Sequence, residues 1–415
     1  MAGSETNLSP LLLDQPACDP REWLLDPAVV FLNHGAFGAC PRQVLTVQTE
    51  WRTRLERQPL QFLARELEPA LDNARAVLAA FVGAEPDNLV FVPNTTTGVN
   101  TVLRSLTFAP GDELLVTNQE YNASRNALDF VAARAGARVV VVEIPFPLRS
   151  ADEIVAPVLA AVTPRTRLAL LDHVSSPTGL VMPLQALVAG LAARGVDTLV
   201  DGAHAPGMVP LNLSALGAAY YTGNCHKWLS APKGAAFLCV RPDRQALIRP
   251  LAISHGANSP RTDRSRYLIE FGWTGTGEVT AYLSVPAALE FMGTRLPGGW
   301  PELMARNRAL ALAARKILCE ALGVAAPCPA DMVGSLAAVP LTDAPPTAWP
   351  RLPVNEYPLQ DNLRVQWGIE VPIMPWPAAP KRCLRISAQL YNSLPQYHFL
   401  AAKLGAMLAA SDGEI

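Results

Sequence analysis

The chain lacks an excess of charge of either sign. Its 415 residues carry 34 basic and 36 acidic side chains, which give a net charge of −2 without a long run of either sign. Proteins that bind nucleic acid or an anionic membrane surface usually carry a basic patch, so we expect neither partner. Half of the residues are hydrophobic and only 17% are charged, far from the composition of disordered chains. A compact protein with a small-molecule partner is therefore expected.

Long apolar segments are also missing. No stretch approaches the roughly 18 consecutive apolar residues of a membrane-spanning helix. The first residues, MAGSETNLSPLLLDQ, have no basic start, and the apolar run at 11–13 is too short for the core of a signal peptide. These absences predict a cytoplasmic protein without membrane association.

Paired cysteines are absent as well. The seven cysteines are an odd number, scattered from Cys18 to Cys383, and none forms a C-x-x-C pair. This pattern suits neither a disulfide framework nor a zinc cluster. We expect reduced thiols and no metal site.

Short apolar runs that alternate with helical patterns indicate the fold class. In residues 66–82, Leu67, Leu71 and Leu78 recur at helical spacing, and Gly83 follows at the position of a C-cap. Other runs lack strict alternation, are rich in β-branched residues and are separated by helical stretches such as 184–193. These runs are 114–116, 139–144, 168–171, 198–200 and 235–240. They predict an α/β fold with a mostly parallel, buried central sheet flanked by helices.

The length of the chain predicts two domains, because it exceeds the size at which one core stops growing. A loop-like stretch covers 254–263, a helical pattern covers 280–292, and many prolines exclude a long helix within 325–380. We expect an N-terminal segment, 1–30, that packs on the small domain, a large domain over 31–280 and a small C-terminal domain over 281–415.

Ligands of open parallel sheets bind at the carboxyl ends of the strands. Asp201 follows the run 198–200 in the segment D-G-A-H-A-P-G. A carboxylate at this place, followed by small residues, can meet a ligand cation, although a simple turn explains it too.

Lys227 lies in a second such segment, T-G-N-C-H-K-W. Lysine forms Schiff bases once it is deprotonated from its reference pKa of about 10.4. An exposed loop lysine is the commoner fate of this residue type, so the residue alone leaves both interpretations open.

Three more strand-end segments carry polar residues. V-P-N-T-T-T-G, at 92–98, precedes a helical pattern at 99–106, and free amides at a helix start suit phosphate, although ordinary capping explains the segment equally well. Tyr121 offers a flat face for a ring, or is a partly buried surface residue. The loop H-V-S-S-P-T-G, at 173–179, carries hydroxyls that could reach a phenolic oxygen.

In their order, these segments resemble the class V aminotransferase family of pyridoxal phosphate enzymes, and within it the branch that contains isopenicillin N epimerase. The resemblance runs from F-L-N-H-G, at 31–35, to L-R-I-S-A-Q-L-Y-N, at 384–392. It implies an aspartate aminotransferase-like arrangement, in which the large domain binds pyridoxal 5'-phosphate and the small C-terminal domain is α+β.

The resemblance also implies roles at the cofactor. Lys227 would form the internal aldimine, Asp201 would keep the pyridine nitrogen protonated, and Tyr121 would stack on the ring. Ser176 and His204 align with groups near the ring hydroxyl. The phosphate cradle aligns with Thr95, Thr96, Asn224 and His226.

Substrate and partner residues follow in the same way. Arg385 aligns with the arginine that binds the α-carboxylate of an amino-acid substrate, a task suited to its two-pronged guanidinium. Asn33 and His34 align with a loop near the substrate. The segment at 271–278 resembles one that reaches the phosphate of the neighbouring subunit through Thr276, which implies a homodimer with a shared active site.

Epimerisation or racemisation is the first expectation for the reaction, because the resemblance is greatest to that branch. The freed lysine would be one base, and Tyr121, His34 or a residue of the neighbouring subunit would be the second acid. A C–S or other β-lyase and an aminotransferase stay open, since one cofactor frame serves several reactions. A cofactor-binding regulatory module is the non-enzyme alternative, but no basic DNA-binding extension flanks the domain.

Cysteine desulfuration is the outcome that the sequence disfavours. Desulfurases of this family carry a nucleophilic cysteine about fifteen residues before the carboxylate-binding arginine, and residues 367–372 contain none. Cys383 is too close to Arg385 to replace it. Cys225 is expected to be a packing residue.

Overall fold

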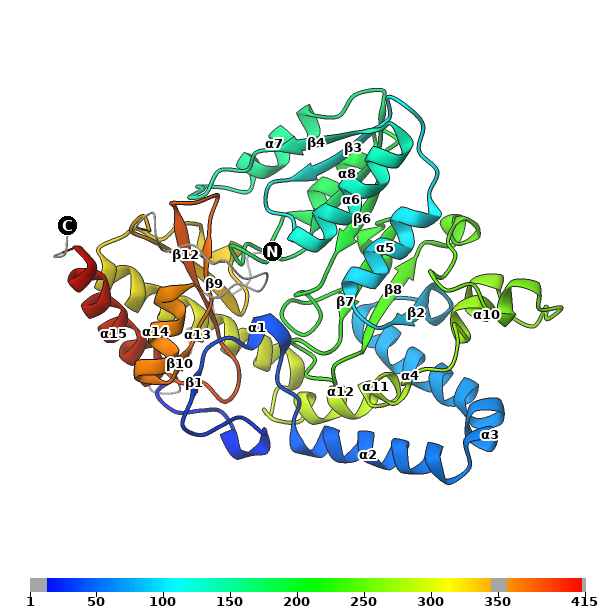
Figure 1. Ribbon diagram of the computed structural model, residues 1–415, viewed down its shortest axis with the longest axis horizontal. Coiled ribbons are helices and arrows are strands. Elements are labelled where there is room, and N and C mark those ends of the chain that lie inside the picture. The colour runs from blue at the N-terminus through cyan, green and yellow to red at the C-terminus, as the bar shows by residue number, and fades with distance from the viewer. Residues whose placement is uncertain (1–12, 345–356, 413–415) are drawn as a thin grey trace.

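The computed structural model describes residues 13–344 and 357–412, and its centre is a seven-stranded sheet (Figure 1). The strands lie in the order β2-β8-β7-β6-β5-β3-β4, and only β8 runs against its neighbours. Their bounds are β2 (Leu89–Val92), β3 (Glu113–Thr117), β4 (Arg138–Val142), β5 (Thr166–Asp172), β6 (Asp197–Asp201), β7 (Tyr220–Asn224) and β8 (Ala236–Val240). The predicted α/β class with a mostly parallel central sheet is confirmed.

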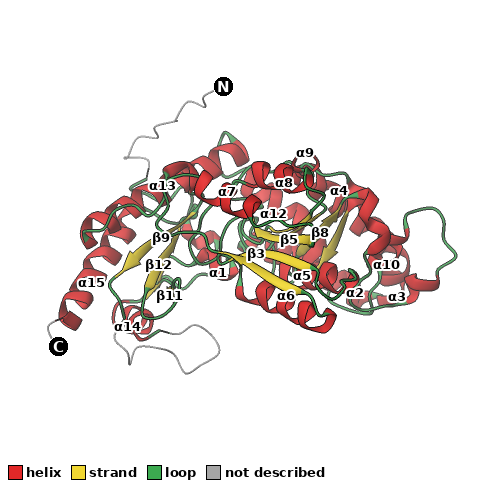
Figure 2. Cartoon of the chain, turned by 90° about the horizontal axis from the view of Figure 1, so that it is seen from above, coloured by secondary structure: helices red, strands yellow, loops and turns green. Residues whose placement is uncertain are grey.

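Helices cover both faces of this sheet (Figure 2). Successive strand residues point to opposite faces, so Leu199 joins one core cluster and Val200 the other. The cluster of Leu199 includes residues of α5 (Thr95–Ser105) and α6 (Asn122–Ala135). The opposite cluster is closed by α4 (Leu67–Val82), α7 (Asp152–Ala160) and α8 (Leu184–Ala192). Because both faces are buried, the strands read as continuous apolar runs.

The C-terminal part is a smaller α+β unit, as predicted. A three-stranded antiparallel sheet has the order β11-β12-β9, formed by β9 (Leu336–Leu341), β11 (Ile373–Pro375) and β12 (Arg382–Ser387). The helix α13 (Gly299–Leu322) packs against β9 and α15 (Leu394–Asp412). The short strand β10 (Ile369–Glu370) follows α14 (Pro358–Trp367) and pairs with β1 (Val30–Phe31).

The described N-terminal residues contact this C-terminal part. The backbone N–H of Ala17 donates to the Leu390 carbonyl at 2.7 Å, and the buried ring of Trp23 lies 5.0 Å from that of Tyr391. The helix α12 (Val285–Gly293) packs on α13 and also on α2 (Arg42–Arg57) and α4. The domain limits 1–30, 31–280 and 281–415 stay a prediction.

Short elements complete the described chain. They are the helices α1 (His34–Phe37), α3 (Pro59–Gln61), α9 (Leu213–Leu216), α10 (Arg266–Gly272) and α11 (Thr280–Leu283). Single 3-10 turns lie at Pro20–Glu22, Pro86–Asn88, Pro242–Leu247, His255–Asn258 and Ala330–Met332, and a π-helical turn lies at Phe62–Glu66. Within the described ranges, no helix combines the length and apolar character needed to cross a bilayer.

Two local expectations differ from the structure. The single helix predicted over 280–292 is divided into α11 and α12, because Pro286 near the start of α12 has no N–H for the preceding turn. The strand β7 was not anticipated, since Gly223 and Asn224 are residue types depleted in strands. By contrast, α4 ends where expected, with Gly83 in the left-handed region at φ +64°.

The close packing of α5 on β7 gives a test of the fold. A Cβ atom on Gly98 would lie 2.1 Å from Oγ1 of Thr222. We expect Gly98→Ala to lower the free energy of unfolding by about 1–3 kcal/mol, as overpacked cores do, measured by urea denaturation. Gly272→Ala is the matched control, because no heavy atom of another part of the described chain lies within 4 Å of its Cβ position. Equal losses in the two variants would contradict this account.

Candidate active site

The predicted site residues gather at the carboxyl end of the central sheet. Asp201 ends β6, Lys227 follows β7, and Ser176 follows β5. Thr95 begins α5 after β2, and Tyr121 immediately precedes α6 after β3. Crossover connections therefore bring segments that are far apart in the sequence to one edge.

Lys227 is partly buried, and its Nζ lies 3.1 Å from Nε2 of His204. Burial lowers the pKa of Lys227 to about 7, the Arg385 charge lowers it further in the same direction, and Asp201 partly offsets both. A large fraction of the amine is thus neutral near neutral pH, which a nucleophilic lysine requires.

The protonation of the neighbouring His204 determines which group donates the hydrogen bond between His204 and Lys227. Its Nδ1 lies 3.4 Å from Nε1 of Trp228, which can only donate, so Nδ1 accepts. Burial, together with the Lys227 charge, holds the pKa of His204 well below its usual range, so the ring is neutral and carries its proton on Nε2. That N–H donates to Lys227 Nζ, which must then offer a lone pair.

Asp201 is 3% exposed and accepts hydrogen bonds from the Ser124 hydroxyl at 2.7 Å and the Ala203 N–H at 3.0 Å. Burial raises its pKa, and within the described residues Lys227 is the only charged group that favours its ionised form. A protonated ring nitrogen would supply the missing cation, so this carboxyl fits the predicted cofactor.

The start of α5 has the features of a phosphate cradle. The Asn94 side chain caps the helix by accepting from the Thr97 N–H at 2.8 Å, and Asn224 Oδ1 accepts from the Thr95 N–H at 3.0 Å. The Thr95 hydroxyl is buried without a hydrogen-bond partner among the described residues. A helix N-terminus with an unpaired hydroxyl fits a phosphate. The other two predicted members are Thr96, in the first turn, and His226, whose Nδ1 lies 3.3 Å from the Ala235 carbonyl oxygen.

Arg385 projects from β12 and is only 4% exposed. Its Nη1 donates to the carbonyl and, at 3.2 Å, to the hydroxyl of Ser176, whereas its Nε has no partner among the described residues. Burial lowers the pKa of Arg385 to about 10, an effect that the Tyr121 hydroxyl partly offsets. A buried guanidinium with a spare donor is suited to a substrate carboxylate.

His34 holds the backbone of the lysine segment. Its Nε2 lies 3.0 Å from the Lys227 carbonyl oxygen, and its Nδ1 lies 2.8 Å from the Tyr391 hydroxyl. Burial lowers the pKa of His34 to about 3, so the ring is neutral. The neighbouring Asn33 donates to Glu370 at 3.4 Å. Since both nitrogens of His34 are engaged, the geometry favours a positioning role over proton transfer.

Thr276 is the one predicted site residue that a single chain keeps apart. It is exposed in the loop between α10 and α11, and within the described part of one chain nothing joins it to Lys227 or Asp201. Such a position is compatible with contact to a second chain, which stays a prediction.

Sequence reasoning missed three buried polar residues of the site. Ser124, in the first turn of α6, donates a hydrogen bond to Asp201, while Glu120 and Asp172 are two further buried acids nearby. The position of Asp172 directly before the loop at 173–179 is a sequence signal for a strand-end carboxyl. Its pairing with Asp201 depends on the order of the strands in the sheet, which one sequence does not reveal.

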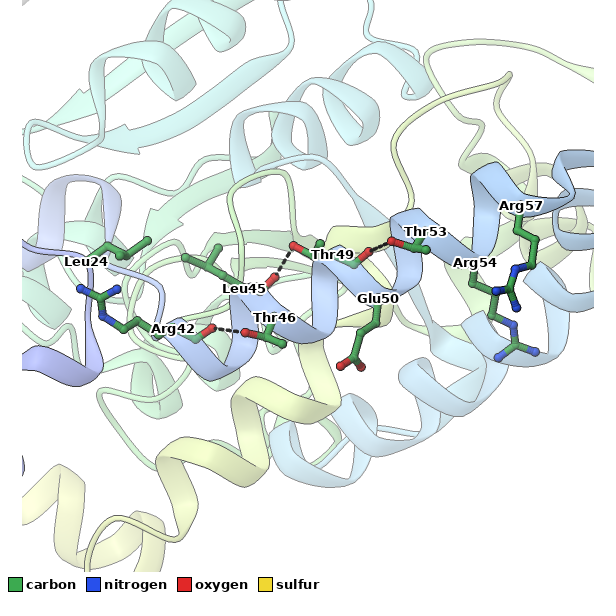
Figure 3. A pocket seen from close by; sticks show the side chains of 9 residues that line it. All are labelled: Leu24, Arg42, Leu45, Thr46, Thr49, Glu50, Thr53, Arg54 and Arg57. Carbon is green, nitrogen blue, oxygen red and sulfur yellow. Dashed lines mark hydrogen bonds between the residues drawn. The ribbon is translucent and has the colours of Figure 1, made fainter.

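A surface groove of about 720 Å³ lies elsewhere, along α2 (Figure 3). The hydroxyls of Thr46, Thr49 and Thr53 each donate to the carbonyl four residues earlier in the helix. Its lining residues are Leu24, Arg42, Leu45, Thr46, Thr49, Glu50, Thr53, Arg54 and Arg57. None of the predicted site residues lines this groove, so it is separate from the predicted active site.

Comparison with known proteins identifies the family of the chain. Residues 30–350 match the model of the class-V aminotransferase family. The chain belongs to this family. It is therefore a pyridoxal phosphate-dependent enzyme of class V, and the predicted family and cofactor are confirmed.

Among its relatives, isopenicillin N epimerase of Amycolatopsis lactamdurans is 37% identical over 92% of this chain and 95% of that protein. A probable chloroplastic L-cysteine desulfhydrase of Arabidopsis thaliana is 31% identical over 92% of this chain and 84% of that protein. The resemblance to the isopenicillin N epimerase branch is thus confirmed, and the chain is also similar in sequence to a desulfhydrase.

Solved structures share the fold. A mutant of the cystine C-S lyase C-DES, with glycine covalently linked to its pyridoxal phosphate, has a TM-score of 0.75 at 23% identity and covers 91% of this chain and 96% of that chain. A cysteine desulfurase of Escherichia coli has a TM-score of 0.73 at 19% identity and covers 97% of this chain and 99% of that chain. At this identity the likeness concerns the architecture.

None of the seven cysteines, all within the described ranges, forms a disulfide. Burial raises the pKa of Cys383 to about 12 and also raises that of Cys225. Thiols with raised pKa values are poor nucleophiles. The expectation that desulfuration is disfavoured stays a prediction, and these buried thiols support it.

The lowered pKa of Lys227 predicts a pH-dependent cost to folding. A lysine whose pKa falls from 10.5 to about 7 on folding destabilises the fold fully below pH 7, and progressively less as the pH rises toward its unfolded value. In cofactor-free protein, Lys227→Met should raise the free energy of unfolding by about 2–3 kcal/mol more at about pH 6 than at about pH 9.

The measurement is urea denaturation at both pH values. Lys316→Met, at a site where 76% of the side chain is exposed, controls for removal of a solvated lysine. A gain in the Lys227 variant that does not depend on pH would show that the amine is not desolvated.

Proposed function

We propose that this enzyme acts at the α-carbon of an amino acid, and that its reaction is epimerisation or racemisation. The observation that carries the proposal is that one site holds an amine and a buried guanidinium whose Nε has no partner among the described residues, close enough for the Arg385 charge to lower the pKa of Lys227. The identity of 37% and 34% to isopenicillin N epimerases supports the choice of reaction.

The residues divide the task of holding the cofactor. Lys227 would bind its aldehyde carbon, Asp201 would face the ring nitrogen, and the start of α5 at Thr95 would hold the phosphate. His204 and Ser176 would lie at the ring hydroxyl. When bound, the cofactor supplies an electron sink for the bonds at the α-carbon.

Arg385 and Lys227 would then select the bond that breaks. Arg385 binds the α-carboxylate through its free Nε, and its contact with Ser176 keeps the guanidinium in place. This anchor orients the α-hydrogen toward Lys227, a positioning effect. Lys227 Nζ removes the proton, and the Nε2–H of His204 holds that amine in place.

Epimerisation also needs a proton donor on the opposite face, and we assign this role to Tyr121. Tyr121 is 45% exposed, and its hydroxyl is close enough to the Arg385 guanidinium to raise the pKa of Arg385. His34, the other candidate on this chain, has both ring nitrogens engaged.

A C–S or other β-lyase is the second candidate. Relatives of 31% and 33% identity are described as cysteine desulfhydrases, which supports it. Elimination requires a leaving group on the β-carbon and no acid on the opposite face, so Lys227 and Arg385 suffice. Transamination stays open as a third reaction of the same family.

Products in heavy water separate these reactions. Incubation of the purified enzyme with an amino acid should exchange its α-proton and form the other enantiomer without release of keto acid. Pyruvate from cysteine or cystine would instead establish a lyase, and keto acids from other amino acids an aminotransferase. Lys227→Ala should abolish the visible absorbance of the lysine-bound cofactor, and an unchanged spectrum would refute the whole assignment.

Tyr121→Phe tests the second acid. Loss of a positioned acid should slow formation of the other enantiomer by about 10²–10⁴-fold. Exchange of the α-proton with retention should continue, because Lys227 still removes and returns a proton on its own face. Chiral chromatography and mass spectrometry of the same samples measure the two rates, and equal losses in both would assign Tyr121 to ring binding alone.

We further propose a homodimer in which Thr276 meets the phosphate of the neighbouring chain. Thr276→Asp would place a negative charge against that phosphate and weaken cofactor binding in the homodimer. Lys227→Ala would be inactive for a different reason. Mixing the two variants, with exchange of subunits, should restore one intact site per mixed dimer, and no recovery of activity would argue that each chain works alone.

A further inference from the structure

A second pair of buried carboxyls lies beside Asp201. Asp172 is the last residue of β5 and 2% exposed, and Glu120, between β3 and α6, is 8% exposed. In the register of β5 and β6, Asp172 is the direct partner of Asp201. Side chains of paired residues project to the same face of a sheet, so these carboxyls are neighbours.

Glu120 completes a group of three acids. Asp172 and Asp201 both raise the pKa of Glu120, and burial raises it more. Burial and then Asp201 raise the pKa of Asp172 in the same way. Three carboxyls therefore share one desolvated region under the predicted position of the ring nitrogen.

The partners of these acids are unequal. Asp201 has the hydroxyl of Ser124 and the N–H of Ala203. By contrast, both Oε atoms of Glu120 and Oδ2 of Asp172 have no hydrogen-bond partner within the described ranges. The backbone N–H of Tyr121 lowers the pKa of both residues, but no basic side chain is among the groups that shift either pKa.

Other titratable groups around the three acids do not supply a cation to this pair. The positive charge of Lys227 lowers the pKa of Asp201 rather than that of either member of the pair. On β7, burial and then the Asp201 charge raise the pKa of Tyr221. The hydroxyl of Tyr221 lies 2.8 Å from Nδ1 of His173. Burial lowers the pKa of His173 to about 4, so this ring is neutral. Two buried carboxylates without a cation cannot both be ionised.

We propose that Glu120 and Asp172 share one proton at neutral pH, and that these positioning residues leave Asp201 as the ionised member that faces the ring nitrogen. This refinement rests on the proposed function only in the role of Asp201. The protonated pair adds negative potential behind Asp201 without placing three full charges in a dry region. It also lies against the Tyr121 backbone, so it links the charge under the ring to the residue that stacks on it.

The holoenzyme can be examined for this proton directly. Infrared spectra should contain the C=O stretch of a protonated carboxyl at neutral pH, shifted in heavy water. Glu120→Gln and Asp172→Asn each imitate a protonated acid, and either variant should reduce or remove the band. Glu143→Gln, at an exposed position, is the control and should leave it unchanged. Absence of the band from the wild-type enzyme overturns the proposal, whatever the variants do.

Two further measurements separate this idea from a structural role. In cofactor-free wild-type protein, acids with raised pKa values stabilise the fold below about pH 4, and this contribution fades as the pH rises through the neutral range. Glu120→Gln should flatten this slope, whereas an unchanged slope would contradict the shared proton. In the loaded enzyme, the double variant should lower the midpoint of the pH titration of the cofactor absorbance by about one unit, because negative potential is lost.

Failure of this proposal is distinguishable from failure of the proposed function. If Lys227→Ala leaves the absorbance unchanged, the lysine assignment is wrong, but the infrared band and the stability slope still report on Glu120 and Asp172. If the absorbance is lost as expected and no protonated carboxyl is found, only the acid pair is refuted.

Discussion

The removal of the Lys227 amine from water is the constraint on which the site depends. Three neighbours position the amine or lower its pKa. His204 donates a hydrogen bond to the amine, His34 binds the carbonyl of the same residue, and the positive charge of Arg385 lowers the pKa of the amine. A lysine in water would be almost fully protonated at neutral pH and unable to attack a carbonyl carbon. The rings of His204 and His34 must themselves be neutral for this arrangement, and their burial provides that.

The site contains charges of both signs. Asp201, with Asp172 and Glu120 behind it, forms a negative end, whereas the start of α5 and the Arg385 guanidinium are positive. A cofactor with a protonated ring at one end and a phosphate at the other matches this polarity. The substrate carboxylate then completes the balance at Arg385, which has no acidic partner among the described residues.

Much of this could be predicted from the sequence, for physical reasons. The β-branched runs and the Gly83 cap identify buried strands and the end of α4, because both depend on local chemistry. Lys227, Asp201 and Arg385 came from motifs. The strand β7 and the break at Pro286 were missed because tertiary packing decides them. The pairing of Asp172 with Asp201 required the order of the strands, and the engagement of His34 by Tyr391 joins residues 357 positions apart.

The reversed direction of β8 has a consequence for how such an enzyme can diversify. Parallel neighbours are joined by long crossovers, but β7 and β8 are antiparallel, so the lysine segment closes directly between them. The backbone ties this segment at both ends, through Cys225 N to the Ala235 carbonyl at 2.9 Å and Ala231 N to the Cys225 carbonyl at 3.0 Å. Crossover loops can gain or lose residues over evolutionary time without moving the amine. New substrates can thus be acquired at the rim while the anchoring point of the cofactor stays where it is.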